Sequence, residues 1–266
     1  MGMGTMKKLF FTLTFLSLVY SLVAGQGDAM RKVENKAFKA GEVLEYRVHY
    51  GFMDAGIARL EIQNDLKPIG TRNCFHIIGT GKSVGAFDWF FKVRDRYESF
   101  VDNQALVPWL FLRNIEEGTY KKIQNVSFNH SKKTATSEKA TVATPENVQD
   151  LVSSYYFART LDYSNAKPGD LFAFDAYFDD EIIPMKLKFV GREKIKTKSG
   201  TFNSLKFHPQ LLVGRVFKDA DDMTIWVSDD ENKVVIRAEA EILVGSVKMD
   251  LKDYSGLANE FTSKVK

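Results

Sequence analysis

The chain has 266 residues, of which 44% are hydrophobic and 13% aromatic, so it can bury a large core and is not a disordered protein. Its formal net charge is +3, and Lys7 and Lys8 supply two of these charges. This nearly neutral balance gives no electrostatic basis for nucleic-acid binding. Cys74 is the only cysteine, which excludes a disulfide within the chain.

The first residues have the pattern of an export signal. Lys7 and Lys8 precede the uncharged stretch Leu9–Ala24, which is shorter than the roughly 20 residues that span a bilayer. Small residues end the stretch at Gly25, and no cysteine follows that could be acylated. We therefore expect a signal peptide over 1–25 and an exported, periplasmic or secreted protein that is not a lipoprotein. The alternative is an uncleaved N-terminal anchor.

The rest of the chain divides into a domain with two flanking segments. No later apolar run is long enough for a transmembrane helix, so we expect no stable membrane span after signal cleavage. Residues 26–37 are polar and are expected to form a mobile leader. A single β-rich domain is expected over 38–256, followed by a C-terminal tail over 257–266.

The first half of the domain alternates between apolar and polar residues, the period of half-buried strands. In the first segment Leu44, Tyr46 and Val48 alternate with charged and polar residues. The strands expected here are Glu42–Tyr50, Ile57–Gln63, Cys74–Gly79, Phe87–Phe100, Pro108–Arg113, Tyr120–Phe128 and Lys132–Ala143.

The period then changes once, to that of an amphipathic helix. Thr144 is a suitable N-cap, Pro145 suits the first helical position, and apolar residues recur at helical spacing after it. This pattern predicts a helix over Pro145–Leu161. Tyr155 belongs to its apolar face and is expected to be buried, whereas Tyr156 is expected at the edge of any cavity.

Strand signals return after the helix and continue to the end of the domain. The expected strands are Leu171–Phe178, Ile182–Val190, Glu193–Lys198, Phe202–His208, Met223–Val227, Val234–Val244 and Gly245–Leu251. Many short strands separated by turn residues predict a mainly β fold. We expect a large curved antiparallel sheet, or a partly closed barrel, with one main helix covering an apolar face.

No pattern identifies a catalytic residue, a metal site or a cofactor. The four histidines lack metal-ligand spacing, and neither a nucleophile elbow nor a phosphate-binding glycine loop is present. Clustered carboxylates could hold calcium or act as an acid/base pair, but aspartates are also typical of turns. The three acidic clusters are Asp179–Glu181, Asp219–Asp222 and Asp229–Glu231.

Four residues are candidates for ligand binding: Arg159, Tyr156, Trp89 and Phe91. Arg159 lies nine residues after Asp150, so the two cannot pair along one helix face. It therefore needs another carboxylate or a ligand group as its partner. Trp89 and Phe91 share one face of their expected strand, which indicates either core packing or an apolar ligand cavity.

Three segments, in this order and spacing, resemble one family of exported bacterial proteins. They are Gly41-Glu42-x-Leu44-x-Tyr46 with Ala55-Gly56-x-Ala58, Gln149-Asp150-x-x-Ser153-x-Tyr155-Tyr156-x-x-Arg159, and Ile225-Trp226-Val227-Ser228-Asp229-Asp230 with Gly245-Ser246-Val247 and Leu251. Over Phe38 to Tyr254 the chain is similar to the family called domain of unknown function 3108. The resemblance implies export and a β-rich fold, and it carries over no catalytic residue.

Three classes of function remain open. The favoured hypothesis is a binding or carrier protein that holds a lipid-like, apolar or amphipathic envelope molecule between the sheet and the helix. The alternatives are a structural module of an envelope assembly and an enzyme acting on envelope glycans. A large apolar cavity would favour the first class, and an exposed aromatic patch the second. Two carboxylates about 5 to 10 Å apart in a cleft would favour the third. No feature indicates a particular protein partner.

Overall fold

The computed structural model describes residues 30–210, 223–241 and 245–265. The expected signal peptide, the acidic cluster Asp219–Asp222 and the end of the expected strand Val234–Val244 lie outside these residues. Contacts divide the chain into the units Met1–Arg31 and Lys32–Lys266, and the fold is that of the second unit. No helix in the described ranges is long and apolar enough to cross a membrane.

In the described part of the chain, nine strands precede the main helix. They form where apolar and polar residues alternate, because alternate side chains of a strand point to the same face of a sheet. They are β1 (Val43–Tyr50), β2 (Met53–Ile62), β3 (Lys67–Ile69), β4 (Arg72–Ser83), β5 (Arg94–Asp102), β6 (Pro108–Glu117), β7 (Tyr120–Asn129), β8 (Thr134–Thr136) and β9 (Thr141–Ala143). Seven follow it: β10 (Leu171–Phe178), β11 (Glu181–Thr197), β12 (Gly200–Gln210), β13 (Met223–Ser228), β14 (Val235–Glu241), β15 (Ser246–Ser255) and β16 (Lys264–Val265).

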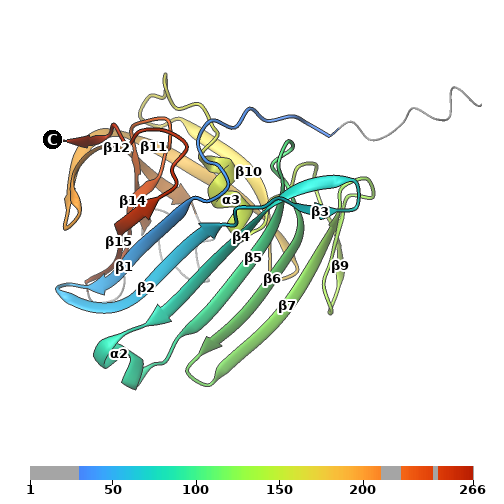
Figure 1. Cartoon of the computed structure of the whole chain (residues 1–266), viewed down its shortest axis with the longest axis horizontal. Helices are drawn as coiled ribbons and strands as arrows, with labels where there is room; N and C mark the ends of the chain where they lie inside the picture. Colours follow the sequence, from blue (N-terminus) through green and yellow to red (C-terminus); the bar gives the residue numbers. More distant parts are fainter. Residues whose placement is uncertain (1–29, 211–222, 242–244, 266) are drawn as a thin grey trace, which may run out of the picture. The chain divides into compact units, whose positions relative to one another are not determined.

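These strands form one large antiparallel sheet, as the sequence predicts. Its main path runs β10-β11-β12-β13-β14-β15-β1-β2-β4-β5-β6-β7-β8-β9, while β16 pairs with β12 and β3 with β4. Strand β1 joins the two halves, because it pairs with β15 on one side and β2 on the other. Among the described strands, β9 and β10 end the path without pairing with each other, so the sheet is curved but not closed. It bends around the main helix, as Figure 1 shows.

The predicted strand Phe87–Phe100 is wrong in its first half. The short helix α2 (Gly85–Phe90) replaces it, and β5 begins only at Arg94. Gly85 has a φ of 60°, a conformation that glycine adopts without strain. The carboxylate of Asp88 then accepts hydrogen bonds from Ser83 and from both terminal nitrogens of Arg94, which holds the helical turn between β4 and β5.

The main helix, α3 (Leu151–Ala158), lies within the predicted range Pro145–Leu161 but is shorter. Its N-cap is Asp150, whose side chain accepts from the backbone N–H of Ser153 in a capping box. Thr144 is not the N-cap, because residues 146–147 form a turn and Gln149 forms a bridge to Ala176 of β10 before the helix begins. The N–H of Gln149 donates to the carbonyl of Asp175, and the carbonyl of Gln149 accepts from the N–H of Tyr177.

Two further parts of the chain are divided into strands differently from the prediction. The expected strand Lys132–Ala143 is the hairpin β8–β9, because the hydroxyl of Ser137 accepts from the backbone N–H groups of Lys139 and Ala140 and forms a turn there. The two expected strands Ile182–Val190 and Glu193–Lys198 are one continuous strand, β11, whose register shifts at a bulge between Phe189 and Gly191.

The helix packs between the two halves of the curved sheet. It contacts β5 on one side and β10 on the other. Tyr156 and Phe157 belong to a buried cluster with side chains of β4–β7, whereas Tyr155 also packs against the cluster built on β1 and β12–β15. Parts of both flanking segments join these clusters: Ala37 lies in the first, and Phe261 packs on the second.

Candidate functional site

Arg159 caps the C-terminus of α3 and is 3% exposed, facing the fully buried Glu42. Its Nη1 donates to Glu42 Oε1 at 2.5 Å and its Nη2 to Oε2 at 2.8 Å. Its Nε donates to the carbonyl of Asn232, and Nη2 also donates to that of Ala37. Burial alone would lower the pKa of Arg159, but the charge of Glu42 raises it. The guanidinium therefore ties α3 to the residue that directly precedes β1, and its charge is already balanced.

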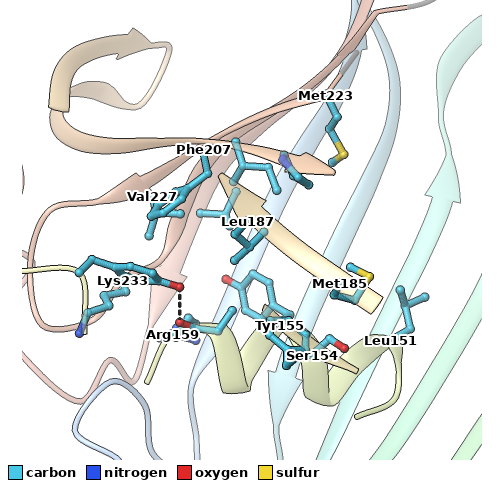
Figure 2. A pocket seen from close by; sticks show the side chains of 16 residues that line it. Leu151, Ser154, Tyr155, Arg159, Met185, Leu187, Phe207, Met223, Val227 and Lys233 are labelled. Carbon is cyan, nitrogen blue, oxygen red and sulfur yellow. Dashed lines mark hydrogen bonds between the residues drawn. The ribbon is translucent and has the colours of Figure 1, made fainter. Parts of the chain in front are cut away.

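A cavity of about 280 Å³ lies between α3 and strands β10–β14. Figure 2 shows Lys233 and Arg159 at one end of it and Leu151 and Met185 at the other. The apolar part of its lining is Leu151, Ala158, Phe174, Met185, Leu187, Phe207, Pro209, Met223, Ile225, Val227 and Val235. Strand alternation explains this wall, because residues two apart on β11, β12 and β13 point to the same face.

Few polar groups reach this cavity, and most of them have partners within the protein. The hydroxyl of Tyr155 shares a hydrogen bond with that of Tyr46 at 3.0 Å, and the hydroxyl of Tyr163 donates to the carbonyl of Ala158 at 2.8 Å. The hydroxyl of Ser154 is different, because it is buried and has no hydrogen-bond partner among the described residues. The Lys233 side chain forms no ion pair within the described part of the chain.

The two tyrosines of α3 lie opposite to the prediction. Tyr156 is 1% exposed, packs edge-on against Phe38 and does not line the cavity. Tyr155 is half-buried and lines it. The prediction assumed a helix with one apolar face. Protein covers α3 on several sides instead, because Val152, Ser153, Tyr156 and Phe157 are all buried.

Trp89 and Phe91 lie away from the cavity lining. Trp89 is in α2 and is 82% exposed. Phe91 is the residue directly after α2 and is also exposed. The shared strand face expected for these two residues does not exist, because α2 occupies that segment. Of the four candidate residues, Arg159 alone lines the cavity, and its partner is Glu42.

The residues that sequence reasoning missed are the apolar ones of β11–β13 and the hydroxyl of Ser154. Alternation in segments such as Met185–Leu187 and Ile225–Val227 predicts an inward face. It does not show that this face borders a void, because a void depends on how the distant strands and α3 pack together.

The acidic clusters within the described ranges form turns and ion pairs. Asp179, in the β10–β11 turn, pairs with Arg113 and Lys122, and the neighbouring Asp180 accepts from Tyr177 and Ser137. In the β13–β14 turn, Asp230 accepts from the hydroxyl of Ser228 and from backbone N–H groups. No group of three or more metal-binding side chains occurs in the part of the chain that the structure describes.

The fold and the cavity define a class: β-rich proteins whose open, curved sheet encloses a helix. A sequence model of the family described as protein of unknown function (DUF3108) matches residues 45–252. The chain therefore belongs to this family, as the three sequence segments indicated. A search of curated proteins finds no match.

One solved structure shares this architecture at low sequence identity. A β-barrel-like protein of domain of unknown function DUF1849 from Brucella abortus is 8% identical, with a TM-score of 0.50 over 86% of this chain and 99% of that one. This likeness concerns the fold alone. A candidate lipoprotein of Parabacteroides distasonis is 12% identical, with a TM-score of 0.37 over 85% of this chain and 99% of that one. An exported protein with a YmcC-like fold from Bacteroides fragilis is 10% identical, with a TM-score of 0.33 over 85% and 100% of the two chains.

Proposed function

We propose that this protein is an exported envelope protein that binds an apolar or amphipathic molecule in the cavity between α3 and strands β10–β14. The observation that carries the proposal is the cavity of about 280 Å³ with its apolar wall. Protein interiors rarely leave voids larger than a water molecule. In another protein, an apolar cavity of about 150 Å³ already admits benzene. The cavity is therefore large enough for an apolar group such as part of an acyl chain.

The polar groups at the cavity support an amphipathic ligand. A buried hydroxyl without a partner costs about 1–3 kcal/mol, and a ligand oxygen or N–H would satisfy that of Ser154. Lys233 lies beside Arg159 at one end, as Figure 2 shows, and its ammonium group would favour an anionic headgroup there. The charge of Arg159 is already balanced by Glu42, so Arg159 is not expected to bind the headgroup. Its role is to hold the end of α3 in place beside the cavity.

The experiment that tests this proposal measures binding of the apolar fluorescent probe N-phenyl-1-naphthylamine to delipidated protein. Leu187→Trp places an indole in the cavity and is expected to weaken probe binding at least about tenfold, because the larger side chain takes up part of the apolar space. Leu171→Trp is the matched control, since Leu171 is exposed on β10 and does not line the cavity. A wild-type protein that binds no probe, or a folded Leu187→Trp variant that binds it as well as wild type, would contradict the proposal.

The export part of the proposal rests on the Lys7–Gly25 pattern and has its own test. We expect an unacylated mature N-terminus at Gly25 or Gln26, because small residues precede the cleavage site and no cysteine stands directly after it. N-terminal sequencing and intact-mass measurement of the protein from its own cells check this expectation. A chain that retains Met1 or Met6 and fractionates with membranes would contradict it.

A further inference from the structure

Exposed apolar side chains gather where three loops meet at one end of the sheet. Backbone hydrogen bonds join the α2 loop to its two neighbours. The N–H of Val84 donates to the carbonyl of Ala55 near the start of β2, and the N–H of Gly118 in the β6–β7 turn donates to the carbonyl of Lys92. Figure 1 shows α2 at this end, beside the tips of β2 and of β6–β7. The exposed side chains, here called the aromatic tip, are Phe52, Met53, Trp89, Phe90, Phe91 and Tyr120.

The aromatic tip is not part of any buried cluster. Phe52 is 91% exposed and Phe90 is 75% exposed, and α2 has no buried residue at all. Trp89 and Phe90 contact each other edge-to-face with ring centroids 4.7 Å apart. Single exposed apolar residues are normal on proteins, but several exposed aromatic residues gathered at one end of a sheet mark an interaction surface.

The unpaired charges next to α2 are positive. Asp54 pairs with Arg47 and Asp88 with Arg94, whereas Lys82 and Lys92, on either side of α2, are exposed and have no ion-pair partner within the described ranges. On the β6–β7 side of the tip, the carboxyl groups of Asp95 and Glu117 share a hydrogen bond. The side of the tip around α2 therefore suits a partner that is negatively charged on the outside and apolar beneath.

We propose that the aromatic tip docks this protein on the surface of an anionic lipid bilayer. Tryptophan, tyrosine and phenylalanine side chains at loop tips suit the headgroup region, because their rings combine apolar area with polar or polarisable edges. Lys82 and Lys92 add attraction to anionic headgroups. The tip is formed by the ends of three loops, which suits shallow insertion into a bilayer. This role is separate from ligand binding in the cavity.

Vesicle flotation with protein isolated in its processed form from its own cells tests this role. The vesicles contain phosphatidylethanolamine with roughly a quarter phosphatidylglycerol. Wild type is expected to float with the vesicles, and Trp89→Ser combined with Phe90→Ser is expected to reduce the bound fraction about tenfold. Leu66→Ser combined with Leu171→Ser is the control, because it removes two exposed apolar side chains outside the tip and should float normally.

Two further variants separate the tip from the cavity and from electrostatics. Leu187→Trp should float like wild type, and the tip variant should still bind N-phenyl-1-naphthylamine. Lys82→Glu combined with Lys92→Glu should weaken flotation at low salt more than at high salt. Failure of wild type to float, or equal flotation of wild type and the tip variant, would overturn the proposal. So would a dimer that the tip variant abolishes while no protein floats, because the tip would then be a contact between copies.

Discussion

Arg159 and Glu42 balance each other's charge in the interior, where neither side chain reaches solvent. Arg159→Gln would leave the Glu42 carboxylate buried without its partner, so we expect a loss of about 3–5 kcal/mol in the free energy of unfolding. Glu42→Gln should be similarly destabilising, and the double variant should recover part of the loss. Urea denaturation of the three variants measures this coupling. An Arg159→Gln protein of unchanged stability that has lost its ligand would instead make Arg159 a ligand-binding residue.

Two adjacent serines of α3 are expected to respond in opposite directions to removal of the hydroxyl. Ser153 completes the capping box with Asp150, so Ser153→Ala should cost about 0.5–2 kcal/mol. Ser154 buries a hydroxyl without a partner, so Ser154→Ala should stabilise the ligand-free protein by about 1 kcal/mol. Urea midpoints of delipidated protein compare the two. If both variants were destabilised equally, Ser154 would have a partner within the protein.

At the scale of elements, the N-cap of α3 gives stability a dependence on pH. Burial raises the pKa of Asp150 from 3.8 to about 6, against hydrogen bonds from Ser99 and Ser153 that lower it. The raised pKa therefore adds to the free energy of unfolding. This contribution is fully present below pH 3.8 and is lost as the pH rises through about 6. The whole effect is about 3 kcal/mol.

The variant Asp150→Asn isolates this dependence, because asparagine is also a good N-cap and does not titrate. Its unfolding free energy relative to wild type should rise between pH 3.8 and about 6 and then remain constant. Buried Asp102 titrates in the opposite sense. Burial raises its pKa, but hydrogen bonds from Arg72, from the backbone N–H groups of Ala105 and Gln104 and from Trp109 together outweigh burial and lower it to about 2. Measuring the difference between variant and wild type removes that contribution. Parallel pH profiles for the two proteins would contradict the raised pKa.

The elements that the sequence predicts well are those that depend on local alternation. Strand β10 has the predicted bounds Leu171–Phe178, and β13 differs from its prediction by one residue at Ser228. Elements that depend on particular side-chain contacts or on distant partners are predicted less well. The start of α3 depends on Gln149 lying along β10, and α2 depends on the contacts of Asp88 with Ser83 and Arg94. Apolar periodicity contains neither kind of information.

At the scale of the whole molecule, the curved sheet creates a site that no single segment encodes. The sequence predicted the fold class. Its hypothesis of a ligand held between sheet and helix named Tyr156, Trp89 and Phe91, and none of these three residues lines the cavity. The lining comes from α3 and five strands whose residues are up to 84 positions apart, from Leu151 to Val235. Their joint packing leaves the space, and packing between distant elements is not visible in a linear pattern.

Native mass spectrometry of the protein released gently from its own envelope is the most direct test for a molecule bound in the cavity. We predict that wild type carries an additional lipid-like mass, that Leu171→Trp retains it, and that Leu187→Trp loses it because the larger side chain takes up part of the apolar space. Organic extraction of the same samples would identify the bound molecule. A wild-type protein with only the mass of its mature chain, or a Leu187→Trp variant that retains the same adduct, would contradict the account.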